Sequence, residues 1–143
     1  MRYLTWDNAF STGIRAIDDE HRLLVQMITQ LQRAQVTGTI DAEIARVLRA
    51  LVDYVGQHFG HEEAIMAQID FAEIESHKVL HQEFAQKLVA ILTNLREGKT
   101  LKASELLDFL AHWLTGHIIR EDGKIGRAFR ERQSKLSSVA ERP

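Results

Sequence analysis

The sequence predicts an all-α protein: an up-down-up-down antiparallel four-helix bundle preceded by an extended N-terminal arm. First, the single proline among the 143 residues is the last one, Pro143, so no proline interrupts a helix. Second, apolar residues recur at three- and four-residue steps in four segments. Third, the connections between these segments are short, which makes neighbouring helices antiparallel. The length of the chain indicates one domain.

The first sixteen residues are predicted to form the arm. Their aromatic residues (Tyr3, Trp6 and Phe10) lack a helical period, and Gly13 lies near the end of the segment. Asp18 or Asp19 is the expected N-cap of a first helix that runs to about Val36. One stripe of this helix contains Ile17, His21, Leu24, Ile28 and Leu31.

Three further helices follow by the same reasoning. The second comes after a turn at residues 37–39 and ends near Gln68. The third is expected to start at Asp70 and to stop at residues 97–99, and the fourth begins near Ser104.

The end of the chain is predicted to leave the bundle. Gly123 and Gly126 are expected to interrupt the fourth helix and to leave a short continuation to Arg132. The domain therefore spans residues 1–131, with residues 1–16 as its arm. Residues 132–143 are predicted to be a polar, frayed tail.

Composition excludes several classes of protein. The chain has no cysteine, so disulfides, thiolate metal sites and iron–sulfur clusters are excluded. Its formal net charge of −2 gives no broadly basic surface for nucleic acid or an anionic membrane. The N-terminus lacks the apolar core of a signal peptide, and no apolar run approaches the length of a membrane span. We therefore expect a cytoplasmic protein that does not insert into membranes.

Seven metal-type side chains interrupt the apolar stripes of the four helices. They are His21, His58, Glu62, His77, His81, His117 and Asp122. The pairs His58/Glu62 and His77/His81 are spaced i, i+4, which puts both members of each pair on one helix face. Burying such groups without partners is costly, and a lone core histidine usually has a hydrogen-bond partner. Five histidines and two carboxylates on four inward faces instead predict a metal centre in the bundle core.

The donor set narrows the choice of metal. Imidazole and carboxylate without sulfur suit iron, manganese, zinc or copper. Zinc sites usually stop at four ligands, and one octahedral ion takes six, so seven ligands are too many for one ion. Two octahedral ions that share both carboxylates and one oxo or hydroxo bridge leave a single position open. A small molecule such as dioxygen would bind there.

These residues and their surroundings resemble the hemerythrin family, in particular the single-domain bacterial hemerythrins. The resemblance covers nearly the whole chain, through Trp6, Gly13-Ile14, Ile17-Asp18-x-x-His21, His58-Phe59-x-x-Glu62-Glu63, His77-x-x-x-His81 and Trp113-Leu114-x-x-His117-Ile118-x-x-x-Asp122. It implies two non-heme irons joined by an oxo or hydroxo bridge and by Glu62 and Asp122. It also implies that His77, His81 and His117 bind one iron and complete its coordination. The other, held by His21 and His58, keeps the open position that binds dioxygen.

The resemblance also implies an apolar pocket that shields bound dioxygen from water and protons. Its expected residues are Phe59, Leu114, Trp113, Ile17 and Ile118. The alternative is that they are ordinary core residues, and this alternative is stronger for Ile17 and Ile118 than for Leu114. Two histidines stay outside the ligand set. His112 is placed on the surface, because five residues separate it from His117 on a helix. His61 competes with His58 as a ligand, and the i, i+4 pairing with Glu62 favours His58.

The sequence therefore indicates an oxygen carrier rather than an enzyme. Oxygen-activating di-iron enzymes of the ferritin type use four carboxylates and Glu-x-x-His motifs, and no glutamate here stands three residues before a histidine. Two alternatives stay open: reduction of peroxide or nitric oxide at the same centre, and an oxygen or redox sensor that acts through a partner. An oxygen-consuming enzyme is a possible recipient of the dioxygen.

Overall fold

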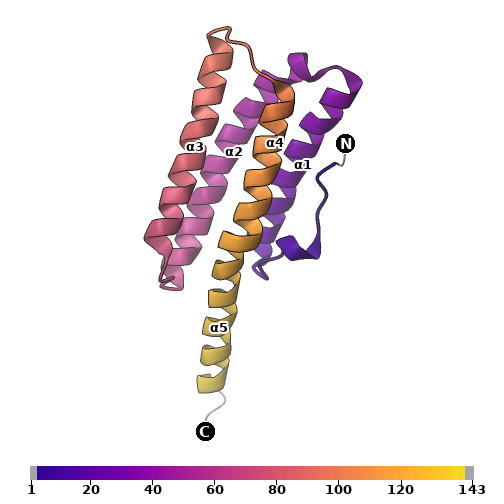
Figure 1. Cartoon of the computed structure of the whole chain (residues 1–143). Coiled ribbons are helices and arrows are strands. Elements are labelled where there is room, and N and C mark those ends of the chain that lie inside the picture. Colours follow the sequence, from indigo (N-terminus) through magenta and orange to yellow (C-terminus); the bar gives the residue numbers. More distant parts are fainter. Residues whose placement is uncertain (1–2, 141–143) are drawn as a thin grey trace.

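The computed structural model describes residues 3–140, with the side chains of residues 3–138. Its α-helices are α1 (Arg15–Thr37), α2 (Ile40–Gln68), α3 (Ile74–Arg96), α4 (Ala103–Gly116) and α5 (Gly123–Ala140). A π-helical turn, η2 (His117–Asp122), joins α4 to α5, and a short 3-10 turn, η1 (Asn8–Phe10), lies in the arm. The helices α1 to α4 alternate in direction and form the predicted four-helix bundle (Figure 1).

Glycine ends two of the helices where the sequence predicts turns. Gly38 adopts φ 78° and donates its N–H to the carbonyl groups of Ala34 and Gln35 at the end of α1. Gly98 adopts φ 79° just after α3. Glycine takes this left-handed conformation without the steric cost that a Cβ brings, so both predicted stops are confirmed.

The predicted start of α3 at Asp70 is wrong. Asp70 adopts φ 52°, a left-handed conformation that lies outside the helical region. The next residue, Phe71, donates its N–H to the carbonyl oxygen of Met66 at 2.9 Å and buries its ring. The chain therefore turns before α3 begins at Ile74.

The first helix also begins earlier than its predicted cap. Helix α1 starts at Arg15, so Asp18 lies in its first turn rather than at the N-cap. The Asp18 carboxylate accepts hydrogen bonds from the Thr12 N–H at 2.7 Å, the Thr12 hydroxyl at 2.8 Å and the Ser11 hydroxyl at 2.8 Å. Burial opposes its ionisation, but these hydrogen bonds outweigh burial and lower the pKa of Asp18 below its ordinary value. Asp18 therefore anchors the arm to the start of α1.

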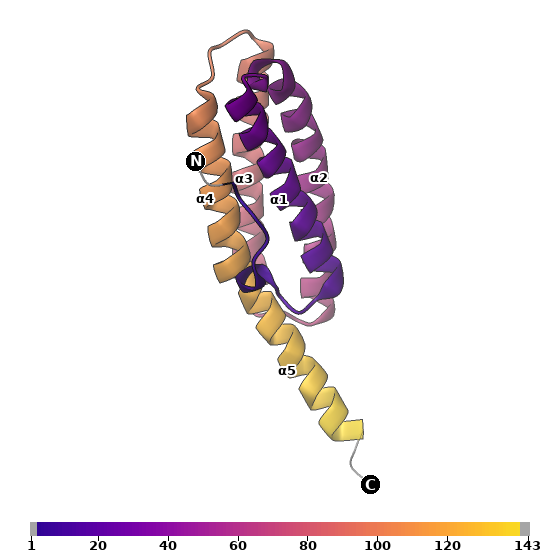
Figure 2. The ribbon, with the colours of Figure 1, turned by 90° about the vertical axis from the view of Figure 1, so that its right-hand side faces the viewer.

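The arm then runs along the outside of α1 (Figure 2). The Leu4 N–H donates to the side-chain oxygen of Gln32 at 2.7 Å, and the Thr29 hydroxyl donates to the Leu4 carbonyl at 2.6 Å. Phe10 is buried in the bundle core. The predicted extended arm is present, with one 3-10 turn in its middle.

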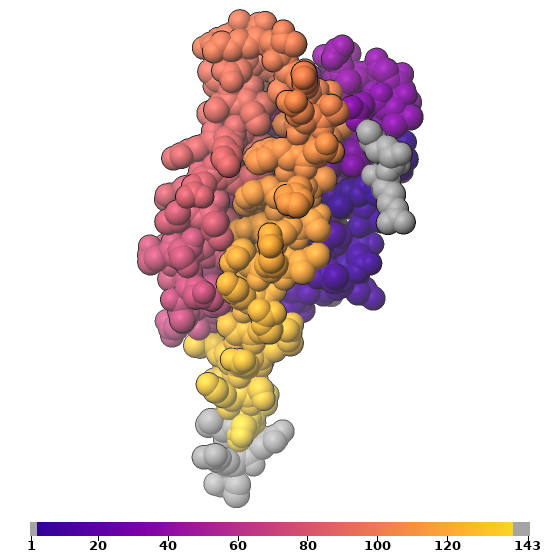
Figure 3. All heavy atoms as spheres, viewed as in Figure 1, coloured from indigo at the N-terminus to yellow at the C-terminus, as the bar shows by residue number. Residues whose placement is uncertain are grey.

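The interruption predicted at Gly123 and Gly126 does not occur, because α5 continues directly from η2. Gly126 instead lies against the arm, where an added Cβ would fall far inside the contact distance of the Thr12 carbonyl oxygen. Helix α5 passes the predicted end at Arg132 and reaches Ala140. It projects beyond the bundle (Figures 1 and 3), and its side chains at residues 131–138 are exposed. The last three residues of the predicted tail lie outside the described residues.

Replacing Gly126 with alanine is expected to lower the free energy of unfolding by about 1–3 kcal/mol, because the new Cβ displaces the arm at Thr12. A matched control is Gly56→Ala in α2, where an added Cβ has no neighbour within 4 Å. That change should stabilise the protein by about 0.5–1 kcal/mol, since alanine is the better helix former. Urea unfolding of both variants measures the difference, and equal effects would contradict the close approach at Gly126.

Two apolar clusters fill the interior. The larger occupies most of the bundle and includes Leu24, Val55, Phe59, Phe84 and Leu114. The smaller lies at the end near the α2–α3 turn and consists of Ile14, Ile17, Met66, Phe71 and Ile125. Along the helices, the predicted metal ligands fall between members of the two clusters. Among residues 3–140, no helix has an apolar stretch that could cross a bilayer.

Candidate metal centre

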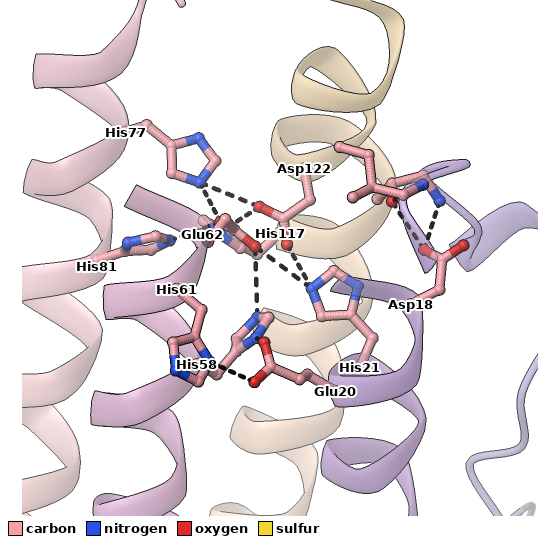
Figure 4. A network of polar contacts seen from close by, with 12 residues as sticks. Asp18, Glu20, His21, His58, His61, Glu62, His77, His81, His117 and Asp122 are labelled. Atoms are coloured by element: carbon pink, nitrogen blue, oxygen red, sulfur yellow. Dashed lines mark hydrogen bonds and ion pairs between the residues drawn. The ribbon is translucent and has the colours of Figure 1, made fainter. Parts of the chain in front are cut away.

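The seven predicted ligands converge on one buried layer (Figure 4). Helix α1 supplies one of them, α2 and α3 supply two each, and η2 supplies two. In chain order they are His21, His58, Glu62, His77, His81, His117 and Asp122. None is more than 6% exposed, and the two carboxylates are completely buried. The structure thus brings together every residue of the predicted set.

The seven side chains divide into two overlapping groups. One ligand atom from each member of a group lies within 4.8 Å of the others. The three-histidine group consists of His77, His81 and His117 with both carboxylates. The two-histidine group consists of His21 and His58 with the same carboxylates. The carboxylates, Glu62 and Asp122, therefore belong to both groups.

Glu62 directs one oxygen toward each group. Its Oε1 atom lies 2.8 Å from His77 Nε2 and 3.0 Å from His81 Nε2. Its Oε2 atom lies 3.5 Å from His21 Nε2 and 3.3 Å from His58 Nε2. This is the arrangement that a carboxylate needs to bridge two metal ions.

Asp122 also directs one oxygen toward each group. Its Oδ1 atom lies 3.0 Å from both His77 Nε2 and His117 Nε2, and its Oδ2 atom lies 2.9 Å from His21 Nε2. The two carboxylates thus approach the same pair of positions from α2 and η2. The donor set fits two metal ions that share both carboxylates.

The π-helical turn explains how His117 and Asp122 reach the same site. On an α-helix, residues five apart lie about 140° around the axis from each other, at about 100° per residue. In η2 the wider turn returns to the same face after five residues, so both side chains point inward. The same spacing within the regular helix α4 leaves His112 exposed, as predicted. The five-residue separation of His117 and Asp122 was the sequence signal for this turn.

The buried polar atoms of this layer fit a metal site. His21 Nε2, His117 Nε2, Glu62 Oε2 and both Asp122 oxygens lack hydrogen-bond partners of good geometry, although all are buried. Buried polar atoms without partners are rare in folded proteins. Because these atoms face one another, metal ions between them would satisfy all of them at once.

The sequence matches the profile of the hemerythrin HHE cation binding domain over residues 12–129. The chain belongs to the hemerythrin family. The resemblance read from the sequence is confirmed, and the seven converging residues all lie within the matched range.

Named hemerythrins are similar over most of their length. The bacteriohemerythrin of Pseudomonas aeruginosa is 34% identical, over 95% of this chain and 88% of its own length. That of Methylococcus capsulatus is 32% identical, over 88% of this chain and 96% of its own. A crystal structure of wild-type hemerythrin superposes with a TM-score of 0.82 at 29% identity, over 89% of this chain and 98% of that one. This agreement extends to the whole bundle.

Two carboxylates next to the predicted ligands were not predicted from the sequence to have a role. Glu20 Oε1 lies 3.0 Å from His58 Nδ1, and Glu63 Oε2 lies 2.9 Å from His81 Nδ1. Glu20 Oε2 also lies 2.6 Å from Nδ1 of His61, whose side chain is 65% exposed. His61 therefore contacts the surroundings of the centre, while His58 faces the other ligands.

The residues predicted to form an apolar pocket do not lie in one cluster. Phe59, Leu114 and Ile118 belong to the larger cluster, with half-buried Trp113 packed against it, whereas Ile17 belongs to the smaller one. Two aromatic rings stack directly on predicted ligands. The ring centroid of Phe59 lies 3.7 Å from that of His81 with planes 2° apart, and the ring centroid of Trp113 lies 4.4 Å from that of His117 with planes 10° apart. These stacks restrain the ring orientation of both histidines.

The contacts between the buried histidines and the two carboxylates determine the protonation of the metal-free centre. Burial favours neutral imidazole, but close polar contacts with Asp122 and Glu62, together with the negative charges of these carboxylates, outweigh burial and raise the pKa of His21 and of His77 to about 9. Burial also opposes ionisation of Glu62 and Asp122, but their contacts with the histidines outweigh burial and hold the pKa of both carboxylates below their ordinary values. At neutral pH the metal-free centre therefore contains imidazolium groups paired with carboxylates.

The metal-free protein is expected to lose stability as pH rises from 6.5 through 9. A histidine whose pKa is raised by folding stabilises the fold fully below its ordinary pKa, and this contribution disappears above the raised value. The expected loss is about 3 kcal/mol for each of the two histidines, His21 and His77, because a tenfold change in proton affinity corresponds to about 1.4 kcal/mol. Urea unfolding at pH 6.5 and 9.5 measures it. Metal-loaded protein should not share this loss, since ligating imidazoles must be neutral; a flat profile without metal would contradict the pairing.

Proposed function

We propose that this protein binds dioxygen reversibly at a non-heme di-iron centre and acts as an oxygen carrier rather than as an enzyme. The main support is the unequal division of histidines between two positions that share both carboxylates. With an oxo or hydroxo bridge, His77, His81 and His117 would fill one octahedral iron. His21 and His58 would leave the other iron with one open position.

The ligand types favour binding over oxidation. The two irons would supply, when bound, the electrons that reversible dioxygen binding requires. The chain surrounds them with five neutral imidazoles and only two carboxylates, Glu62 and Asp122. Few anionic ligands give little stabilisation to high-valent iron, so the protein environment favours release of dioxygen over activation of the O–O bond. Phe59, Leu114, Trp113 and Ile118 would keep water and protons away from the open position, with Ile17 on the other side of the ligand layer.

Cycles of air and argon test the proposed function. Protein loaded anaerobically with ferrous iron should contain two irons per chain, develop colour in air and bleach under argon over several cycles. Continuous consumption of reductant with peroxide or nitric oxide, together with irreversible oxidation by air, would indicate an enzyme instead. One zinc per chain after expression in iron-replete medium would contradict the di-iron assignment.

Replacing Leu114 with serine should shorten the lifetime of the oxygenated protein severalfold while iron content stays at two per chain. A hydroxyl one turn before His117 would bring a proton donor or water toward the centre. The control is Leu107→Ser, because Leu107 is buried to a similar extent in the same helix, at 3% against 5% exposed, but lies ten residues from His117. Spectral decay in air measures both lifetimes. Equal lifetimes would mean that Leu114 is an ordinary core residue with no role in shielding the centre.

A further inference from the structure

The two carboxylates behind the ligand layer are divided between its halves. Glu20 contacts Nδ1 of His58, which belongs to the two-histidine group, at 3.0 Å. Glu63 contacts Nδ1 of His81, which belongs to the three-histidine group, at 2.9 Å. In both cases Nε2 of the same ring faces Glu62, at 3.3 and 3.0 Å. Each outer carboxylate therefore touches one ligand of one metal position.

We propose that Glu20 and Glu63 are positioning residues, each of which sets the metal affinity of one half of the centre. A carboxylate that accepts the Nδ1–H of a histidine fixes the tautomer in which Nε2 carries the lone pair. It also fixes the ring plane and raises the basicity of the ligating nitrogen. Since Glu20 and Glu63 act on different rings, the two metal positions can be tuned separately.

The two positioning contacts differ in how they are supported. Glu20 lies at the surface edge of the layer, with 19% of its side chain exposed, and its second oxygen contacts His61 Nδ1 at 2.6 Å. This second contact holds the Glu20 carboxylate in the plane that reaches His58 (Figure 4). On the other side, the stack of Phe59 on the His81 ring adds to the restraint from Glu63. The contacts thus come from separate elements, α1 for Glu20 and α2 for Glu63.

The inference rests on the proposed two-metal centre, and Co²⁺ binding to metal-free protein tests the two separately. Trp113 stacks on His117, so its fluorescence reports an ion in the three-histidine half. A Trp6→Phe background makes Trp113 the only tryptophan, since the chain has two. Visible absorption counts the Co²⁺ bound in both halves, and fluorescence quenching follows one of them.

The two variants should produce opposite results. Glu63→Ala should shift the quenching of Trp113 to about 10–100-fold higher Co²⁺ and spare the other ion. Glu20→Ala should spare the quenching and weaken the other ion by a similar factor. Glu20→Gln and Glu63→Gln, which keep a neutral acceptor oxygen, should recover part of the affinity. If Glu20 and Glu63 had only a structural role, the glutamine variants would not recover affinity, and each alanine variant would not weaken one Co²⁺ ion alone.

The control is Glu83→Ala, which removes the same charge from an exposed position of α3 and should leave both affinities unchanged. If the parent protein does not bind two Co²⁺ ions, the two-metal centre itself is contradicted. If the parent binds two but both alanine variants weaken both ions equally, or neither ion, the positioning roles of Glu20 and Glu63 are overturned.

Discussion

Replacing Glu62 with alanine is expected to remove at least one iron per chain and to destabilise the metal-free fold by about 3–5 kcal/mol. Glu62 is completely buried, and its oxygens contact Nε2 of four histidines from three helices. Without it, the imidazolium groups of the metal-free protein lose a partner that they cannot replace from water. With metal, both ions lose a shared ligand. Iron analysis and urea unfolding of metal-free protein at pH 6.5 measure the two effects.

His112→Ala is the matched control, since it removes an imidazole from the exposed side of α4. This variant should keep both irons, the native spectrum and the stability of the parent protein. His81→Ala should resemble Glu62→Ala, because it removes a buried member of the three-histidine group. If His112 proved essential for iron and His81 did not, the assignment of the ligand set would be wrong.

Side-chain periodicity was enough to find both i, i+4 pairs, because His58/Glu62 and His77/His81 lie in regular helices. On such helices, spacing along the chain translates directly into position around the axis. The same rule predicted the exposure of His112. It also explains why α2 was predicted with nearly its observed bounds, since one buried stripe, with His58 and Glu62 among its apolar members, runs from Ile40 to Met66.

The roles of Asp18 and Gly126 depend on tertiary contacts, which helical periodicity does not predict. Asp18 looks like a helix cap in the sequence, but its partners, Thr12 and Ser11, belong to the arm that precedes α1. Gly126 looks like a helix breaker, yet it is needed because the arm approaches its backbone. Local sequence does not show where a distant segment will pack, so both roles became visible only in the fold.

The outer carboxylates were missed for a related reason. Glu63 follows Glu62 directly and Glu20 precedes His21, so neither continues the helical spacing of the ligand stripe. Each lies beside a ligand from its own helix but contacts a histidine on the neighbouring helix. Such contacts depend on how α1, α2 and α3 are rotated against one another, which spacing within a single helix does not specify.

The turn η2 leads to the second large expected effect. Inserting one alanine between Ile119 and Arg120 should abolish binding of both irons. His117 and Asp122 would then be six residues apart, and a regular helix would separate them by about 240° around its axis. The insertion would also rotate α5 by about 100° and carry Gly126 away from its contact with Thr12. Loss of stability should accompany the loss of metal.

Deleting Ile119 should have a much smaller effect than the insertion, although both change the chain by one residue. The deletion leaves His117 and Asp122 four residues apart, the spacing that His58/Glu62 and His77/His81 already use on regular helices. A π-helical turn contains one residue more than an α-helical turn, so removing the exposed Ile119 converts η2 to α-helix while both side chains still point inward. We expect the deletion variant to retain two irons at reduced affinity and the insertion variant to retain none. Iron content and thermal unfolding of the two variants measure the difference. The insertion and the deletion differ in the direction in which they rotate Asp122 about the helix axis. Equal loss of iron in both variants would therefore mean that the wide turn does not set the position of Asp122.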